Sequence, residues 1–510
     1  MRAEEAYEEL VRLARDESLL ASCEALLEWD ELTQMPPGGV EQRSRQRALL
    51  AGLLHEQATH PRRGELLAMI EGSALCADPE APQAANVREL RRVFERRCRL
   101  PRRLAEETAR VTSLAQQEWV AAREQADFGR FEPWLERIVR LKREEAACLG
   151  VGEEAYDALL DGYEPGARSA ELEHLFERLR RELVPLAAAI RGANRRPRTA
   201  VLRRDFPIDR QRAFGEEVAA AVGFDFERGR LDVSAHPFST SIGPGDCRIT
   251  TRFDAHNFCD GFFAILHEVG HALYDQGLDP QWRGTPAGEA ASVGMHESQS
   301  RLWENRVGLS RGFWEHFYPR AQATFRSALR GVSLDEFHFA IHAVAPSLIR
   351  VDADEVTYGL HILARFEIER ALVRGDLAVP DVPAAWREAY RRHLGIEPAS
   401  DAEGCLQDGH WAEGLIGYFP TYVLGDVVAA QLYEAAAAEL GDLEAQLATG
   451  EFGGLRAWLR ERIHRPGGRL SAARLVERVT GRPPEPGPLV GALRRKYAEL
   501  YGLSVGSSSA

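Results

Sequence analysis

The stretch from Phe258 to Gly277 contains the feature that most constrains this chain, the motif His267-Glu268-Val269-Gly270-His271 within an otherwise apolar segment. Its length and its pattern of apolar residues predict one buried helix. Residues four apart lie on the same face of a helix, so the two imidazoles can bind one metal ion. Glu268 then lies beside the ion, where a carboxylate can take a proton from water. The motif therefore predicts a metal site with a general base, and Gly277 is expected to cap the helix.

A third ligand is expected on the next helical segment, residues 289–308, because a catalytic zinc normally has three protein ligands and one open position. Three glutamates there fall on approximately one face: Glu289, Glu297 and Glu304. Glu297, the middle one, is the preferred ligand. Glu304 or Glu289 would then accept a hydrogen bond from a ligand imidazole. His296 is adjacent to Glu297 and, on a regular helix, is expected to point elsewhere.

Charge and apolar patterning exclude several classes of partner. The chain has 510 residues with 64 basic and 78 acidic side chains, a net charge of −14. Nucleic acids and anionic membranes normally select a basic face, so neither is expected as a partner. No apolar run is long enough for a membrane span, and the charged N-terminal stretch is unlike a signal peptide. Seven scattered cysteines without a Cys-x-x-Cys pair are typical of reduced thiols in a cytoplasmic protein.

Periodicity predicts a mainly α protein with one catalytic domain over residues 1–503 and a disordered tail at 504–510. A helical lobe is expected over residues 1–192, a β region with the metal site over 230–310, and further helices over 311–503. The only convincing β pattern is residues 231–253, which predict two short strands around the turn Gly243-Pro244-Gly245. The metal helix follows directly, so the strands are expected to border the site.

Five motifs, in this order, resemble those of the carboxypeptidase Taq family of zinc metallocarboxypeptidases. They are Asp246-x-Arg248-x-Thr250, His267-Glu268-x-x-His271, His296-Glu297-Ser298-Gln299, Ile349-Arg350-x-x-Ala353-Asp354 and Gly404-x-x-Gln407-Asp408-x-His410-Trp411. His236-Pro237-Phe238 and Gly417-Tyr418-Phe419-Pro420-Thr421-Tyr422 are also similar to the family. The resemblance extends over nearly the whole chain.

The resemblance implies long helices forming a deep groove, with a small antiparallel sheet beside the metal helix, similar in plan to neurolysin and angiotensin-converting enzyme. It implies that Glu297 completes a zinc site with His267 and His271, one ion per chain, with cobalt also accepted. It implies that the enzyme removes single residues from free peptide C termini with broad side-chain tolerance. Members of this family commonly form homodimers.

The resemblance also suggests roles for other residues. Glu268 would move the proton, and His410 with Tyr418 or Tyr422 would stabilise the oxyanion. A free C-terminal carboxylate is best recognised by a bidentate arginine. Arg350 is the first choice for this role, with Asp354 one turn later as its orienting partner, and Arg248 is the second. Gln407 and His236 are further candidates for substrate binding, and Asp408 for fixing a loop.

Two other functions are compatible with the same residues. A zinc oligopeptidase or dipeptidase of this fold would cut elsewhere in a peptide. A peptide-binding protein that has lost catalysis would usually lack the base or a ligand, whereas Glu268 and all three expected ligands are present here. The preferred side chain, the substrate length, the native metal and the dimer interface do not follow from the sequence.

Overall fold

The computed structural model describes residues 1–150 and 153–503, and the tail predicted at 504–510 lies outside them. The described residues form two compact units, each assembled from segments that are distant in sequence. Unit 1 contains residues 1–98, 198–341 and 428–483. Unit 2 contains residues 99–197 and 342–427 and the described residues from 484 on. The chain passes from one unit to the other several times.

Helices make up most of unit 1. Its helices are α1 (Ala3–Thr33), α2 (Val40–Ala58), α3 (Pro61–Ile70), α4 (Pro82–Arg99), α9 (Ile208–Val222), α10 (Phe258–Gly277), α11 (Val293–Arg301), α12 (Arg311–Thr324), α13 (Leu334–Ile341), α17 (Leu443–Ala448), α18 (Gly453–Leu459) and α19 (Ala472–Thr480). A π-helical segment, Leu302–Gly308, follows α11, and a second, Arg460–His464, follows α18. The helix α16 (Pro420–Leu440) contains residues of both units.

Prolines and glycines mark the ends of the helices in the N-terminal region. The helix α1 ends at Thr33, before the Met35–Gly39 segment, and α3 and α4 begin at Pro61 and Pro82. Proline is favoured in the first turn of a helix because its missing N–H is one of the groups that have no intrahelical partner there. Local backbone chemistry therefore determines where these helices begin and end.

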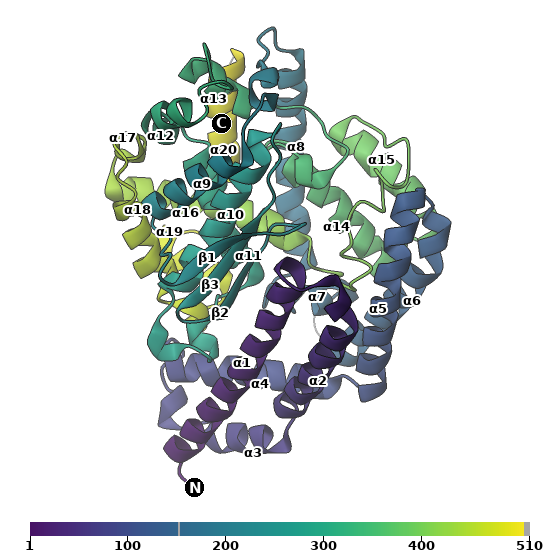
Figure 1. The fold of residues 1–510 in the computed structure, drawn as a ribbon. Coiled ribbons are helices and arrows are strands. Elements are labelled where there is room, and N and C mark those ends of the chain that lie inside the picture. Colours follow the sequence, from purple (N-terminus) through teal and green to yellow (C-terminus); the bar gives the residue numbers. More distant parts are fainter. Residues whose placement is uncertain (151–152, 504–510) are drawn as a thin grey trace. The chain divides into compact units, whose positions relative to one another are not determined.

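The sheet beside the metal helix differs from the prediction. It has three strands, β1 (Gly229–Val233), β2 (Ser239–Gly243) and β3 (Asp246–Thr251), in the order β1-β3-β2 (Figure 1). The strands β2 and β3 form the predicted antiparallel hairpin, whereas β1 pairs with β3 in parallel, so the sheet is mixed. The predicted first strand is interrupted at residues 234–238. There Pro237 has no N–H to donate, and Ser234 Oγ bonds the carbonyl oxygen of His236 at 2.6 Å.

The helix α10 runs through the core of unit 1, with the bounds that the sequence predicts. Phe258, Phe262, Ile265, Leu266 and Val269 are all buried in one continuous apolar cluster. Gly277 is the last residue of the helix rather than its cap. A Cβ there would lie 2.3 Å from Nδ1 of His464, so this glycine provides space for a neighbouring ring.

Unit 2 is also helical. Its helices are α5 (Arg102–Gln125), α6 (Phe128–Leu149), α7 (Ala155–Leu160), α8 (Ser169–Gly192), α14 (Tyr358–Arg374), α15 (Val382–Leu394) and α20 (Gly487–Tyr501). A long segment between α15 and α16 contains the Gly404–Trp411 motif, and Trp119 Nε1 of α5 donates a hydrogen bond to the carbonyl oxygen of Leu406 within it, at 2.9 Å. The segment is thus attached to the helices of its own unit.

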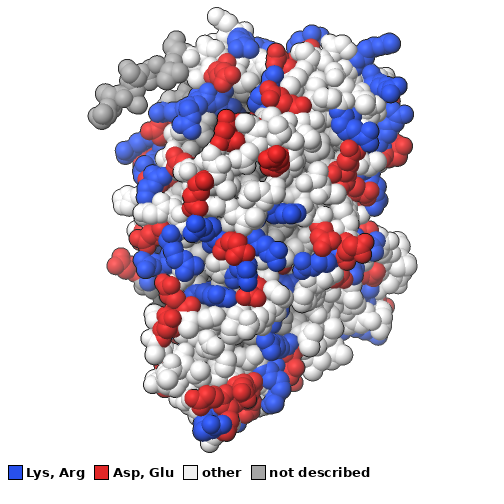
Figure 2. Space-filling model, turned by 90° about the vertical axis from the view of Figure 1, so that its left-hand side faces the viewer, with Lys and Arg blue, Asp and Glu red and all other residues white. Residues whose placement is uncertain are grey.

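None of the helices formed by residues 1–150 and 153–503 is long and apolar enough to cross a membrane. Acidic and basic side chains are interspersed on the face drawn in Figure 2, which shows no extended basic patch.

Candidate metal centre and active site

Three side chains of unit 1 converge on one point. Oε2 of Glu297 lies 3.6 Å from Nε2 of His267 and 3.4 Å from Nε2 of His271. The three donor atoms lie within 4.8 Å of one another. Two imidazole nitrogens and one carboxylate oxygen are a donor set that divalent zinc, cobalt or manganese accepts. The imidazoles are 19% and 15% exposed, so the point is not sealed from solvent. The residues present therefore fit a divalent cation.

Close packing of α11 on α10 brings Glu297 to the imidazoles. Gly270, within the motif on α10, is the contact point, because a Cβ there would lie 2.5 Å from the carbonyl oxygen of Gln299 and from Cα of Ser300. These are backbone atoms and cannot rotate away. Gly270 is one of the two unspecified positions of the His267-Glu268-x-x-His271 motif, although a glycine inside a buried helix is a signal of close approach.

Replacing Gly270 with alanine is expected to force α10 and α11 apart. The overpacking should destabilise the fold by about 1–3 kcal/mol. Metal affinity should also fall, since Glu297 moves away from the imidazoles. Thermal unfolding and metal titration measure the two effects.

Gly52 is the matched control for this prediction. It lies in the middle of α2, with no atom within 4 Å of the position its Cβ would take. Gly52→Ala should therefore be neutral or stabilise by roughly 0.5–1 kcal/mol through its backbone entropy. Equal effects of the two substitutions would contradict the role of Gly270 in helix packing.

The ligand imidazoles have partners on their other ring nitrogens. Nδ1 of His267 lies 2.8 Å from Oε2 of Glu304, one of the two acceptors that the sequence proposes. Nδ1 of His271 lies 2.6 Å from Nδ1 of His296, which was expected to point elsewhere. Glu289 lies outside this helix, since α11 begins only at Val293, after Ser292 as its N-cap. Both Nδ1 atoms are thus occupied, and only the Nε2 atoms remain for a metal.

Glu297 is held by Arg301, one turn further along α11. Nε of Arg301 donates to Oε1 of Glu297 at 2.8 Å, while Oε2 faces the imidazoles. Burial acts to raise the pKa of Glu297, but His267, Arg301 and His271 outweigh burial and hold this pKa well below its usual range. The carboxylate is therefore ionised at neutral pH, as a metal ligand must be.

Glu268 is 6% exposed and adjoins the donor set on α10. Burial is the largest influence on the pKa of Glu268 and raises it to about 7. A carboxyl group with a pKa in this range can both accept and return a proton near neutral pH. The position and the acidity of Glu268 thus suit a general base.

The two imidazoles differ in proton affinity in the metal-free chain. Burial lowers the pKa of His267, but Glu297 and Glu304 outweigh burial and raise it to about 9. Burial lowers the pKa of His271 to about 4. At neutral pH, His267 therefore carries a proton that a metal ion must displace, whereas His271 does not.

Metal binding is therefore expected to release about one proton below pH 9. Because the competing proton leaves His267 as the pH rises, affinity should increase about tenfold per pH unit between pH 7 and 9 and level off above. Calorimetric titrations in buffers of different ionisation enthalpy measure the number of protons that are released per metal ion bound. An affinity independent of pH over this range would exclude a protonated His267 as ligand.

Arg248 on β3 lies in the same unit. Its Nε and Nη2 bond Asp246 at 2.8 and 2.7 Å, and its guanidinium lies 4.2 Å from the ring centroid of Trp29 on α1. Its Nη1 donates no hydrogen bond to any residue that the structure describes. His236, another predicted substrate-binding residue of this unit, is exposed.

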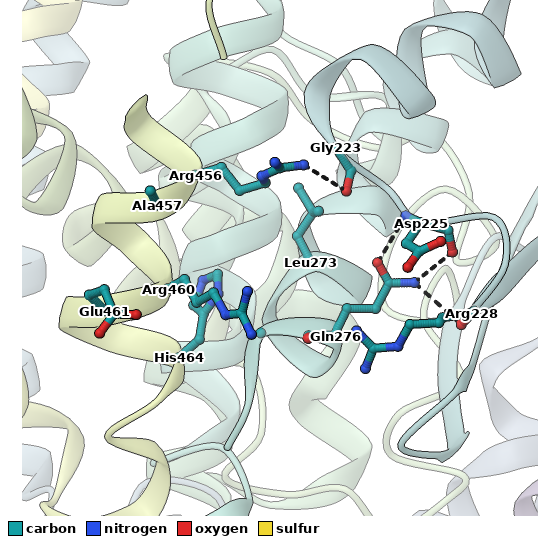
Figure 3. Close-up of a pocket in the computed structure, with 11 residues that line it drawn as sticks. Gly223, Asp225, Arg228, Leu273, Gln276, Arg456, Ala457, Arg460, Glu461 and His464 are labelled. Atoms are coloured by element: carbon teal, nitrogen blue, oxygen red, sulfur yellow. Dashed lines mark hydrogen bonds between the residues drawn. The ribbon is translucent and has the colours of Figure 1, made fainter. Parts of the chain in front are cut away.

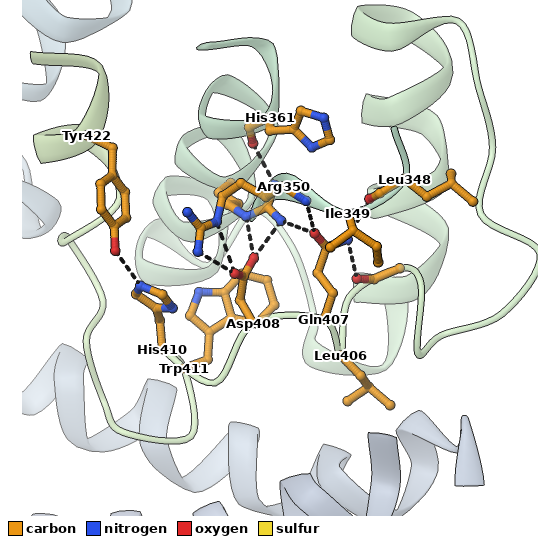
Figure 4. A network of polar contacts seen from close by, with 12 residues as sticks. Leu348, Ile349, Arg350, His361, Leu406, Gln407, Asp408, His410, Trp411 and Tyr422 are labelled. Atoms are coloured by element: carbon orange, nitrogen blue, oxygen red, sulfur yellow. Dashed lines mark hydrogen bonds and ion pairs between the residues drawn. The ribbon is translucent and has the colours of Figure 1, made fainter. Parts of the chain in front are cut away.

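Arg350 belongs to a buried polar network in unit 2 (Figure 4). Its Nε and Nη2 bond Oδ1 of Asp408 at 3.0 and 2.9 Å, and its Nη1 donates to Tyr358 at 3.2 Å. Oδ2 of the same carboxylate binds Nε of Arg365 at 2.7 Å. Burial acts to raise the pKa of Asp408, but the two guanidinium groups outweigh it and hold this pKa well below its usual range. Asp408 therefore joins two arginines.

Two expectations about this network need correction. Asp354 does not orient Arg350, because its oxygens accept hydrogen bonds from Thr357, Val356 and Ala345 instead. The orienting partner is Asp408, which is 58 residues distant in sequence. Gln407 is 7% exposed and uses its amide within the protein, where Oε1 accepts from Arg350 N and Arg365 Nη2. These bonds position a loop.

His410 and the two tyrosines form an aromatic group in unit 2. Nε2 of His410 lies 3.1 Å from the hydroxyl of Tyr422, and the Tyr418 and Tyr422 rings are 5.4 Å apart. The guanidinium of Arg350 lies 5.0 Å from the centroid of the Tyr422 ring. The candidate oxyanion donors and the candidate carboxylate receptor are therefore neighbours.

A cavity of about 340 Å³ lies at the C-terminal end of α10 (Figure 3). It is lined by Arg228, Arg456 and Arg460, and by Gln276 and His464 among others. None of the three candidate ligands lines it. We therefore place the chemistry at the metal group and not in this cavity.

The helix with two histidines and an adjacent glutamate, completed by a glutamate from a second helix, defines the class of the protein as a metal-dependent peptidase. The chain belongs to the carboxypeptidase Taq (M32) metallopeptidase family, whose model matches residues 9–497. It is accordingly a carboxypeptidase, a hydrolase that acts on peptides.

Known relatives match along nearly the whole chain. The thermostable carboxypeptidase 1 of Thermus thermophilus is 51% identical over 511 residues, covering 98% of this chain and 100% of that protein. Carboxypeptidase 1 of Bacillus subtilis is 36% identical over 477 residues, 94% of this chain and 95% of that protein. The crystal structure of an M32 carboxypeptidase from Deinococcus radiodurans superposes with a TM-score of 0.95 at 42% identity, covering 98% of this chain and 100% of that one.

Proposed function

We propose that this carboxypeptidase uses one zinc ion, held by His267, His271 and Glu297, to remove single residues from free peptide C termini with broad side-chain tolerance. The observation that carries the proposal is the convergence of the two Nε2 atoms on one oxygen of Glu297. A divalent cation bound there supplies a Lewis acid and lowers the pKa of water to about 7. Cobalt suits the same donors.

Glu268 is the proposed general base. Its carboxylate takes a proton from the attacking water and returns that proton to the departing amine. The buried position of Glu268 favours both directions, because its raised pKa lies close to neutral pH. One residue thus serves both halves of the hydrolysis.

His410, with Tyr418 or Tyr422, is proposed to donate hydrogen bonds to the oxyanion that forms on the scissile carbonyl. Such a donor is typically worth about 3 kcal/mol. The contact between His410 and the Tyr422 hydroxyl orients both groups. His410→Ala and Tyr422→Phe are expected to lower kcat more than they raise KM, as measured on a peptide with a free C terminus.

Arg350 is the proposed receptor for the substrate carboxylate, and Arg248 is the alternative. Asp408 fixes the plane of the Arg350 guanidinium, and the second N–H groups of Nη1 and Nη2, beyond those that bond Tyr358 and Asp408, are the pair proposed to bind the carboxylate. The argument for Arg248 is the Nη1 that it does not use for Asp246. His236 is retained as a further candidate on the substrate path.

Substituting Arg350 separates a carboxypeptidase from an oligopeptidase of the same fold. Arg350→Lys keeps the charge beside Asp408 but removes the planar pair of donors. The rate at which free-acid peptides are cleaved should fall by about 10- to 100-fold. The ratio of this rate to the rate for amidated peptides should also decrease. Arg370→Lys is the control, since Arg370 forms a half-buried ion pair with Glu154 elsewhere in unit 2. If Arg350→Lys keeps the wild-type preference for free-acid over amidated peptides and Arg248→Lys loses it, Arg248 is the carboxylate receptor instead.

We further propose a cytoplasmic homodimer with a deep groove like that of neurolysin and angiotensin-converting enzyme. All seven cysteines are free, which suits a reducing compartment. Sedimentation of the purified chain tests the dimer.

Digestion of one peptide with a free and with an amidated C terminus, with and without chelator, tests the function itself.

A further inference from the structure

The second ligand histidine, His271, is connected to a partly buried chain of polar side chains. Its Nδ1 lies 2.6 Å from Nδ1 of His296, whose Nε2 lies 3.2 Å from Oδ1 of Asp275. The rings of His271 and His296 are stacked, with centroids 4.6 Å apart and planes 23° apart. Tyr274 packs on His296 with centroids 5.3 Å apart. His296 is therefore fixed at both nitrogens and in contact with two rings.

The direction of these hydrogen bonds follows from metal binding. A ligand imidazole offers the lone pair of Nε2, so its proton is on Nδ1. Nδ1–H of His271 then donates to Nδ1 of His296. His296 in turn carries its proton on Nε2 and donates it to Asp275. Each imidazole thus has one tautomer that is compatible with both of its neighbours. Asp275 determines this tautomer for His296, and through His296 for His271.

We propose that His296 and Asp275 are positioning residues that hold His271 in the tautomer and orientation that bind metal. The inference rests on the metal site proposed above. It concerns groups that form hydrogen bonds with the ligands. Replacing such a group commonly weakens metal affinity by about 10- to 100-fold. His267 meets its carboxylate, Glu304, directly, whereas His271 reaches one through a second imidazole. The two ligand histidines are therefore oriented by different devices.

Two substitutions of His296 separate hydrogen bonding from packing. His296→Gln keeps a carbonyl oxygen that can accept from His271, whereas His296→Leu has a similar size and no acceptor. Zinc affinity is measured by competition with a chelating dye, on folded protein. We expect His296→Leu to bind zinc about 10- to 100-fold more weakly than wild type. His296→Gln is expected to recover most of this loss.

Asp275→Asn tests the other end of the chain, and its side chain, 13% exposed, changes little in size. The asparagine amide can donate to Nε2 of His296 and so favour the tautomer with the proton on Nδ1, which faces the proton of His271. A loss of zinc affinity of about tenfold or more is expected. This variant keeps the test decisive should the His296 variants not fold.

His393→Leu is the control for losing a buried histidine. Nε2 of His393 lies 3.0 Å from a carboxylate oxygen of Glu367 in unit 2, and His393 is 2% exposed. This variant should lose thermal stability without a change in zinc affinity. Wild-type affinity in His296→Leu and Asp275→Asn, or equal losses in His296→Leu and His296→Gln, would overturn the inference. Failure of wild type itself to bind zinc would instead overturn the proposed function.

Discussion

Glu268→Gln is expected to lower kcat by about 10²- to 10⁴-fold while leaving one metal ion bound per chain. Glutamine has nearly the same shape as glutamate, so the packing of the 6% exposed side chain is kept. Its amide cannot take a proton from water, so the base is lost and the ligands are not. Steady-state rates on a peptide with a free C terminus, together with metal content, measure the two properties separately.

Glu289→Gln is the control for this prediction. Glu289 belongs to the segment before α11 and, unlike Glu268, it is exposed, so the same substitution there removes a carboxylate from the surface. It lies outside α11 and is not one of the three side chains that converge on the metal point. The activity of Glu289→Gln should stay within about fivefold of wild type, as expected for a residue that does not stabilise the transition state. Substantial activity in Glu268→Gln would show that another group moves the proton.

The second large effect is expected for Glu297→Gln, which should lose metal and activity together. Even groups beyond the ligands contribute about 10- to 100-fold to metal affinity, so losing the only carboxylate ligand should cost at least 100-fold. The neutral amide also replaces the ion pair with Arg301, whose Nε lies 2.8 Å from Oε1 of Glu297, by a weaker neutral hydrogen bond. Metal titration and activity are measured on the same preparation.

Chelation of wild type is the corresponding experiment without a mutation. Removing an ion that binds only the folded chain should lower the thermal midpoint as well as abolish hydrolysis. Glu297→Gln should show the lower midpoint from the start and respond little to chelator. A variant that keeps both the metal and the midpoint would exclude Glu297 as a ligand.

The sequence predicts the metal helix well and its surroundings less well. The bounds of α10 are confirmed because a long apolar run allows little else. The predicted start of α11, residue 289, is four residues too early, because Ser292 caps the helix. The segment before Ser292 is apolar and acidic, a pattern that is also typical of helices. The parallel pairing of β1 with β3 depends on contacts between strands, and alternation along one strand does not reveal it.

The contacts around the ligands could be predicted only in part. Glu304 follows from helical spacing, and the structure places it at Nδ1 of His267. His296 was missed because a regular helix places neighbouring residues about 100° apart, whereas contact with His271 depends on how closely α11 packs at Gly270. The pairing of Arg350 with Asp408 was missed because a nearer carboxylate, Asp354, satisfied the local pattern. Long-range pairing of charges requires the fold.

The measurement that tests the account most directly is a zinc titration of chelator-treated wild type and Glu268→Gln, with bound metal and hydrolysis recorded at each step. Activity of wild type should rise in proportion to bound zinc and saturate at one ion per chain, while Glu268→Gln binds the same ion and stays inactive. Full activity in metal-free wild type, or zinc that binds without restoring hydrolysis, would contradict a catalytic site built on His267, His271 and Glu297.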